Sequence, residues 1–278
     1  MKKINRRSFL AAAGLTAAAL ALTACGGSAS STASSTASSA ASSEAASTSA
    51  AAELTTVEAG KLTMATNAAF PPYEMTTDAG EFEGIDIDTA KAIAEKLGLE
   101  LQIDDMDFDA ALLSVQQGKA DIVMAGVTVT DERKAVMDFS DRYATGIQSI
   151  IVPEGSDITS PDDLAGKKIG TQRGTTGYIY CSDDFGDDAV VAYDDGLTAV
   201  QALNNGQVDA VVIDNAPAKE FVAANPGLVI LDTSYAEEDY AIGLAKGSAL
   251  EDAVNAALEE LKADGTLQSI VDKYITAE

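Results

Sequence analysis

The chain contains one sequence pattern twice, and this repeat limits the folds that it can adopt. The two segments are ALLSVQQGKADIVMAG at residues 111–126 and AVQALNNGQVDAVVID at residues 199–214. Each has apolar residues at helical spacing, a polar pair, a glycine suited to end the helix, an aspartate and an aliphatic run. A helix that leads into a short buried strand is half of a βαβ unit, so two copies predict two α/β lobes built alike.

The other segments alternate between strand-like and helix-like patterns in the same rhythm. The predicted strands are KLTMAT at 61–66, LELQID at 99–104, KKIGT at 167–171, AVVAY at 189–193 and LVIL at 228–231. Helices are predicted at 85–98 and 216–225 and around two apolar sets near the C-terminus, Leu250, Val254, Leu258, Leu261 and then Leu267, Ile270, Val271, Tyr274. The pattern is typical of an α/β protein whose C-terminal helices could return to the first lobe.

Both copies of the repeat end where open α/β sheets bind ligands, beyond the carboxyl ends of the strands. MAGVTVTDER, at 124–133, follows the first copy, and Asp214 closes the second. If these two edges face each other, Arg133 and Asp214 lie across a cleft. The alternatives are a surface helix position for Arg133 and a helix N-cap before NAPA for Asp214, a role that is compatible with binding.

Missing residue types exclude several kinds of site. The sequence has no histidine, so a Ser-His-Asp triad, a Cys-His pair and an HExxH zinc site are all impossible. Its two cysteines, Cys25 and Cys181, allow no CxxC metal motif. We expect Cys181 to be a small packed residue, although a free thiol could also be reactive. The sequence predicts no metal and no cofactor.

The N-terminus predicts export and a lipid anchor. Residues 1–24 combine four basic residues with an apolar stretch that is short for a membrane span, as in a signal peptide. LTAC, ending at Cys25, resembles a bacterial lipobox, whose cysteine becomes the lipidated first residue; NRRSFL fits either ordinary or twin-arginine export. Residues 25–57, rich in Ser, Ala and Thr, are predicted to be a disordered tether. The chain is therefore expected to be anchored to the outer face of the cell membrane, with no other membrane contact.

Without the signal the chain is strongly acidic. Four of its eighteen Lys and Arg lie in residues 1–24, which contain no acid, so 14 basic residues face 44 acidic ones and the net charge is −30. This balance argues against nucleic acid as a partner and favours cationic ligands.

Six segments resemble one family in family order, the extracellular solute-binding proteins (family 3 type) of bacterial ABC importers for polar amino acids. The matching segments are TNAAFPPYE at 66–74, GIDIDTAKAIAEKLG at 84–98, MDFDAALLSVQQGKADIVMAGVTVTDERKAVMDFSD at 106–141, GKKIGTQRGTTG at 166–177, NNGQVDAVVIDNAPA at 204–218 and LEELKADGTLQSIVDKY at 258–274. Together they span essentially the whole part that is predicted to fold.

The resemblance implies a two-lobed periplasmic-binding-protein-like (Venus flytrap) fold with a discontinuous first lobe. On this basis the first lobe comprises 58–145 and 236–278, the second comprises 146–235, and hinge crossings fall near 144–147 and 233–240. The protein would capture a free polar amino acid between the lobes and deliver it to an ABC permease and its ATPase. It would bind without turnover.

The resemblance also assigns ligand contacts. Arg133 would hold the α-carboxylate and Asp214 the α-ammonium, as the chemistry of a guanidinium and a buried carboxylate supports. Further carboxylate contacts would come from the backbone at Gly126, from Thr128, and from the N–H groups around Thr175 and Thr176, where a helix begins.

The remaining predicted site residues would surround the ligand side chain. Phe70, Tyr73 and Phe108 fall where the family has aromatic walls, although each could instead be core. Asn67 and Gln172 occupy side-chain-reading positions and, being uncharged, point to glutamine or cystine, while the nearby Glu74 keeps arginine and lysine open.

Three other classes of protein remain as alternatives. The main one is a dehydratase-like enzyme on the same scaffold, which would act on a small carboxylate and, without histidine, would need Asp, Glu, Lys or Tyr for proton transfer. A sensor input domain would need further modules, and a purely structural lipoprotein would bind no small molecule.

Overall fold

The computed structural model describes residues 54–275, which form twelve strands, eight α-helices and two short 3-10 helices. The strands are β1 (Lys61–Thr66), β2 (Ala69–Phe70), β3 (Glu74–Thr76), β4 (Phe82–Glu83), β5 (Glu100–Asp105), β6 (Ile122–Val123), β7 (Met137–Pro153), β8 (Ile169–Gln172), β9 (Val190–Tyr193), β10 (Ala210–Asp214), β11 (Leu228–Ile230) and β12 (Ala236–Ala245). The helices are α1 (Ile85–Leu97), α2 (Phe108–Gln116), α3 (Asp131–Val136), α4 (Thr176–Phe185), α5 (Gly196–Asn204), α6 (Asn215–Ala224), α7 (Glu251–Ala263) and α8 (Thr266–Tyr274), with 3-10 turns at Pro161–Leu164 and Asp187–Ala189.

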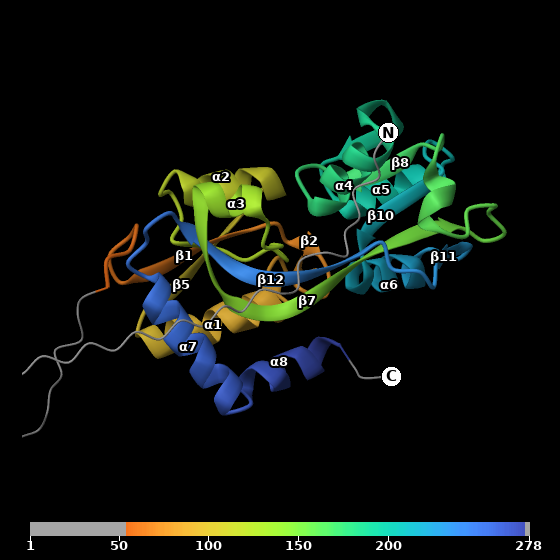
Figure 1. Ribbon diagram of the computed structural model, residues 1–278. Coiled ribbons are helices and arrows are strands. Elements are labelled where there is room, and N and C mark those ends of the chain that lie inside the picture. Colours follow the sequence, from red (N-terminus) through yellow and green to blue (C-terminus); the bar gives the residue numbers. More distant parts are fainter. Residues whose placement is uncertain (1–53, 276–278) are drawn as a thin grey trace, which may run out of the picture. The chain divides into compact units, whose positions relative to one another are not determined.

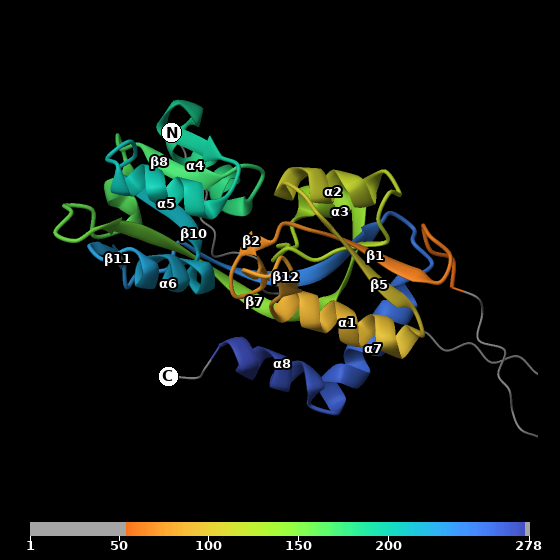
Figure 2. The ribbon, with the colours of Figure 1, turned by 180° about the vertical axis from the view of Figure 1, so that it is seen from behind.

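The strands form two groups of parallel neighbours that are joined by two long antiparallel strands. Strand order is β5-β1-β6-β12-β7-β10-β8-β9, with β11 beside β7, and β2, β3 and β4 form a separate small sheet. β1 runs parallel to β5 and β6, and β8 runs parallel to β9 and β10. Each group is covered by its own helices, as Figures 1 and 2 show, so the chain has the predicted α/β, two-lobed fold.

β7 and β12 connect the two lobes. They pair antiparallel from Ala236 opposite Gln148 to Tyr240 opposite Ala144, and Figure 1 shows them as long ribbons that pass together from one lobe to the other. The predicted crossing at 144–147 lies within β7, and that at 233–240 overlaps β12 from Ala236 to Tyr240. Each crossing is part of a long paired strand.

The second copy of the repeat ends in a strand that is buried on both faces. In β10 the side chains of Val211 and Ile213 join one apolar cluster, while those of Ala210 and Val212 join another. Cys181 is fully buried in this second cluster, as the packed interpretation predicts. A strand covered on both faces explains the continuous aliphatic run.

Both helices of the repeat end at a left-handed glycine. Gly118 has φ 65° and Gly206 has φ 68°, and a Cβ added to either would meet no atom within 4 Å. Glycine is needed at these positions because of its backbone conformation and not because of crowding.

The aspartates of the repeat have the same structural role in both lobes. Asp121 accepts a hydrogen bond from the N–H of Thr63 at 2.8 Å, and Asp209 accepts one from the N–H of Lys168 at 2.7 Å. Each therefore ties the turn after its helix to the start of the neighbouring parallel strand. These two acids belong to the scaffold.

The predicted signal peptide (1–24), Cys25 and most of the predicted tether (25–57) lie outside the described residues. Inside that tether, Leu54 packs against the core, and the N–H of Val57 donates to Asp121 at 2.8 Å. Among residues 54–275, no helix has both the length and the apolar character needed to cross a membrane.

Candidate ligand-binding site

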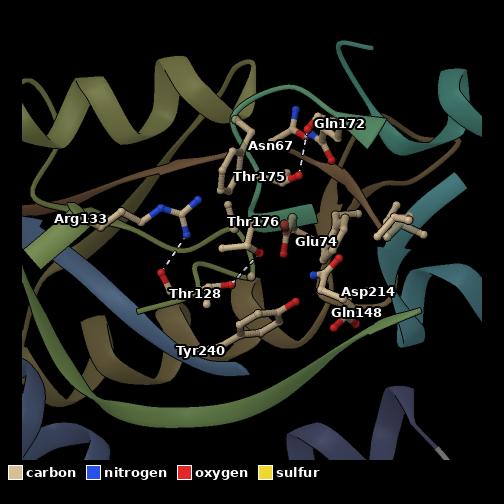
Figure 3. A pocket seen from close by; sticks show the side chains of 16 residues that line it. Asn67, Glu74, Thr128, Arg133, Gln148, Gln172, Thr175, Thr176, Asp214 and Tyr240 are labelled. Carbon is tan, nitrogen blue, oxygen red and sulfur yellow. Dashed lines mark hydrogen bonds between the residues drawn. The ribbon is translucent and has the colours of Figure 1, made fainter. Parts of the chain in front are cut away.

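A cavity lies between the two lobes and is lined by residues of both. Ten of the eleven predicted binding residues line it: Asn67, Phe70, Phe108, Gly126, Thr128, Arg133, Gln172, Thr175, Thr176 and Asp214. Figure 3 shows Arg133 and Asp214 on opposite sides of this cavity, as predicted from the ends of the two repeats.

Arg133 is held in the cavity wall by groups from both lobes. It lies on α3, which begins after Thr130, whose hydroxyl caps the helix by accepting from the N–H of Arg133. Its Nη1 donates to the carbonyl of Thr128 at 2.8 Å, and its Nη2 donates to the carbonyl of Gly174 at 3.1 Å. Its Cζ lies 5.3 Å from the centre of the Phe108 ring. The side chain is 8 % exposed, so the surface-helix alternative is wrong.

Arg133 remains a cation despite this burial. Burial lowers the pKa of its guanidinium from the usual value, and the negative charge of Glu238 opposes that shift. A guanidinium has five N–H donors and stays protonated in proteins. Two donors are used on backbone carbonyls, which leaves three for an anion in the cavity.

Asp214 has the predicted N-cap role and also lines the cavity. It caps α6 by accepting from the N–H of Ala216 at 3.0 Å, and its other oxygen accepts from the N–H of Ile147 at 2.7 Å. Burial raises the pKa of this carboxyl to about 6, although the hydrogen bonds from Ala216 and Ile147 favour the charged form. A nearby cation would lower that pKa again and would compensate the buried charge.

The start of α4 lines the cavity, although both donors of Thr175, its N–H and its hydroxyl, are directed at the carbonyl of Gln172. Thr175 caps the helix by accepting from the N–H of Tyr178 at 3.3 Å, and Thr176 is its first residue. Both line the cavity, and the hydroxyl of Thr176 lies 3.4 Å from that of Thr128. The positive end of a ten-residue helix favours an anion here.

Gly126 could not be replaced without moving the aromatic wall. It has φ 56°, and a Cβ would lie 3.0 Å from the ring of Phe70 and 3.2 Å from that of Tyr240. Its N–H donates to Asp86 at 3.0 Å, so this N–H is not directed at a ligand. Gly126 therefore shapes the cavity through the close approach of its backbone to two rings.

The side-chain amides of Asn67 and Gln172 are hydrogen-bonded to each other. Gln172 Nε2 donates to Asn67 Oδ1 at 2.9 Å across the two lobes, and Asn67 Nδ2 donates to the carbonyl of Met106 at 3.0 Å. The amides predicted to read the ligand side chain are thus mainly engaged with protein groups.

Glu74 differs from the hydrogen-bonded amides of Asn67 and Gln172. It is fully buried, it lines the cavity, and neither of its carboxyl oxygens has a hydrogen-bond partner of good geometry among the described residues. Burial, reinforced by the charge of Asp86, raises the pKa of Glu74 well above its usual value, and burial raises that of Asp86 to about 6. The raised pKa favours the protonated form of Glu74, and a cation placed beside it would favour the ionised form.

Tyr73 lies outside the cavity lining. Its ring packs against Phe70 at 6.0 Å and against the edge of Tyr240 at 5.4 Å between centres, and its side chain is 3 % exposed. It supports the aromatic wall from behind, which is the core position given as its alternative.

Gln148 and Tyr240 line the cavity from the crossing strands and were not among the residues predicted from the sequence. Glu238, on β12, was also missed, although its carboxylate accepts hydrogen bonds from Thr128, Gln148 and Thr176. The available signal was their position, because all three lie in or beside the segments predicted to join the lobes. Among residues 54–275, no group of three or more Cys, Asp or Glu side chains is placed to hold a metal ion.

A two-lobed α/β fold with a charged cavity between the lobes defines a solute-binding protein, and comparison with known proteins gives its family. Residues 62–277 match the family described as bacterial extracellular solute-binding proteins, family 3. The chain belongs to this family.

Individual relatives match over 78 to 99 % of this chain. The chain is 32 % identical to the probable histidine-binding protein of Neisseria gonorrhoeae, over 99 % of this chain and 98 % of that protein. Among solved structures it is similar to the arginine-, lysine-, histidine-binding protein ArtJ of Geobacillus stearothermophilus, with 34 % identity and a TM-score of 0.75, over 78 % of this chain and 96 % of that one. An ancestral arginine-binding protein bound to glutamine has 43 % identity and a TM-score of 0.75, over 78 % and 99 %. These relatives are binding proteins by name, and members of the family are extracellular.

Proposed function

We propose that this protein is the substrate-binding component of an ABC importer and captures a free amino acid with a cationic side chain. The amino acid is bound between the lobes and then presented to the membrane permease and its ATPase. The observation that carries the choice of ligand is Glu74, a fully buried acid that lines the cavity without a hydrogen-bond partner of good geometry in the described part of the chain.

The backbone of the amino acid is a zwitterion and fits the two charges on opposite sides of the cavity. Arg133 binds the α-carboxylate through its remaining N–H donors, helped by Thr128 and by the start of α4. Asp214 accepts the α-ammonium, which compensates a carboxylate that burial disfavours.

The side chain of the ligand then meets Glu74. A guanidinium or ammonium group there would pair with the carboxyl of Glu74, in a cavity that the rings of Phe70 and Phe108 also line. The names of two relatives support a cationic ligand, since one is an arginine-, lysine-, histidine-binding protein and another a probable histidine-binding protein.

A titration of proton release tests this assignment. Because burial raises the pKa of Glu74, its carboxyl keeps a proton to higher pH than an ordinary glutamate, and a bound cation displaces that proton. Calorimetry at pH 7 in buffers of different ionisation enthalpy should show that arginine releases up to about one proton more than glutamine does. Glu74→Gln should remove this difference and weaken arginine binding roughly a hundredfold.

Glu81→Gln is the matched control, because Glu81 is exposed in the same region of the first lobe. It should leave both ligands unaffected. If arginine and glutamine release the same number of protons, Glu74 does not contact the ligand side chain.

A neutral polar amino acid is the second candidate, favoured by the amides of Asn67 and Gln172. Their mutual hydrogen bond of 2.9 Å could be exchanged for bonds to the side-chain amide of glutamine. The ancestral arginine-binding protein has been solved with glutamine and with arginine, so this scaffold accepts both kinds of side chain. A glutamine affinity that exceeds the arginine affinity would favour this candidate.

Export and anchoring form part of the proposal. The basic and apolar residues 1–24 act as a signal peptide, and lipidated Cys25 holds the protein at the outer face of the membrane through a Ser/Ala/Thr tether. Mass spectrometry of the mature N-terminus should find a diacylglycerol adduct on Cys25, and Cys25→Ser should release the protein from the membrane fraction.

The enzyme alternative makes a different prediction. A binding protein returns its ligand unchanged, whereas a dehydratase-like enzyme converts it. Arginine recovered after prolonged incubation should be chemically intact.

A further inference from the structure

A single carboxylate oxygen joins both lobes and both crossing strands. Oε2 of Glu238 accepts hydrogen bonds from Thr128 Oγ1 at 3.0 Å, from Thr176 Oγ1 at 3.0 Å and from Gln148 Nε2 at 3.1 Å. Thr128 follows β6 in the first lobe, Thr176 begins α4 in the second, and Gln148 and Glu238 lie on β7 and β12. Glu238 is 6 % exposed, and its other oxygen, Oε1, has no hydrogen-bond partner among the described residues.

The donors held by Glu238 are the ones that a ligand carboxylate needs. Thr128 and Thr176 line the cavity beside Arg133, and their hydroxyl groups lie 3.4 Å apart. A threonine hydroxyl has one proton to donate. While that proton is bound to Glu238, the hydroxyl cannot donate it to a second carboxylate.

The charge of Glu238 acts in the same direction. It is the nearby negative charge that most strongly favours the protonated form of Arg133, the residue assigned to the ligand carboxylate. A ligand carboxylate that contacts Arg133, Thr128 and Thr176 therefore approaches an existing carboxylate. Two like charges that share one set of donors oppose each other.

We propose that Glu238 is an internal competitor of the ligand's α-carboxylate, so that it lowers the affinity for amino acids and sets how strongly the site prefers them over amines. The proposal rests on the function given above, in which Thr128, Thr176 and Arg133 bind that carboxylate. It goes beyond that function by assigning a role to a residue outside the cavity lining. Glu238 orients the hydroxyl donors of Thr128 and Thr176, and a ligand carboxylate must displace Glu238 from these donors in order to bind.

The test compares Glu238→Gln with the wild-type protein for two ligands. Glutamine has nearly the shape of glutamate, so the variant removes the charge and keeps an oxygen that accepts hydrogen bonds. Calorimetry with arginine and with agmatine, which lacks the carboxylate, measures how far the site distinguishes them. Arginine should bind about tenfold more tightly to the variant, while agmatine affinity should change less than about twofold.

Glu237→Gln is the matched control. Glu237 is the neighbouring residue on β12, and its side chain is exposed. The same chemical change on the opposite face of the strand should alter neither affinity. If wild-type protein binds glutamine and not arginine, glutamine and 4-aminobutanamide form the equivalent pair.

Two results would overturn the proposal. Unchanged or weaker amino-acid binding by Glu238→Gln would mean that Glu238 supports the carboxylate site or has no part in it. An equal gain for the amino acid and its amine would mean a general effect on lobe closure. Failure of the wild-type protein to bind any amino acid is a separate outcome, which would count against the proposed function itself.

Discussion

The two copies of the helix–turn–strand repeat are alike as scaffold and opposite in charge at the site. In both, a left-handed glycine ends the helix and an aspartate ties the turn to the next parallel strand. Beyond the strand they diverge, because the first copy leads to Arg133 and the second ends on Asp214. The repeat therefore builds two similar lobes, and the ends of the two copies bring opposite charges to the cavity, which we propose to be complementary to a zwitterion.

The cationic side of this comparison should have the largest effect when it is removed. Arg133→Ala takes away the charge assigned to the ligand carboxylate and should weaken amino-acid binding about a thousandfold, measured by calorimetry. Arg142→Ala is the control, since Arg142 forms an exposed pair with Asp239. An affinity within threefold of wild type in Arg133→Ala would contradict the assignment.

Removing the charge on the anionic side of the cavity, at Asp214, should have the second-largest effect on affinity. Asp214→Asn keeps one oxygen that can cap α6 but removes the charge and the second acceptor oxygen, to which Ile147 donates, so the fold should persist while affinity falls roughly a hundredfold. Asp195→Asn makes the same change at the cap of α5, where Asp195 accepts from the N–H of Thr198 at 2.7 Å. Equal losses in the two variants would mean that capping, and not charge, explains the effect.

Acidification should distinguish the two sides of the cavity. The pKa of Asp214 is raised to about 6, and an ammonium ligand requires the ionised form, so protons compete with the ligand as pH falls through 6. Affinity for glutamine should fall about tenfold from pH 7 to pH 5. Asp214→Asn should flatten this dependence, whereas the guanidinium of Arg133 does not titrate in this range. A pH dependence that remains in Asp214→Asn would point to another group, such as Asp86, whose pKa is also about 6.

The smallest effects should come from the shared scaffold. Gly118→Ala and Gly206→Ala place a side chain in the left-handed conformation and should each lower the free energy of unfolding by about 1–2 kcal/mol. Asparagine at the same positions should cost less. Both losses, measured by urea denaturation, should be similar, and ligand affinity should stay unchanged. A large loss of affinity from only one of them would show that the two turns are not equivalent.

The sequence predicted the parts of the fold that depend on local pattern. Helix periodicity, the glycine at the end of each helix and the buried strand at 210–214 all have a local physical cause, and the structure has them where expected. A role for Asp214 could also be predicted from the sequence, because a carboxylate after a buried aliphatic run needs a partner. The resemblance to a known family supplied the pairing of the lobes and the choice of Arg133.

Contacts between segments that are distant in sequence could not be predicted from the local sequence pattern. Glu238 lies in an EED run that is typical of an exposed strand, and only donors from three other segments make it a buried acceptor. Asn67 was expected to read the ligand, but its hydrogen bond from Gln172, 105 residues away in sequence, was not predicted. The sequence pattern gives no register between segments so far apart.

The position of β12 has a consequence for how the chain is made. β12 begins at Ala236, yet it lies between β6 and β7 in the sheet. During synthesis the first lobe therefore lacks a central strand until nearly the whole polypeptide is available, whereas β8, β9 and β10 of the second lobe come from one continuous stretch. The lobe that begins first is completed last, and a truncated chain that ends before β12 would expose the edges of both strands that β12 normally joins.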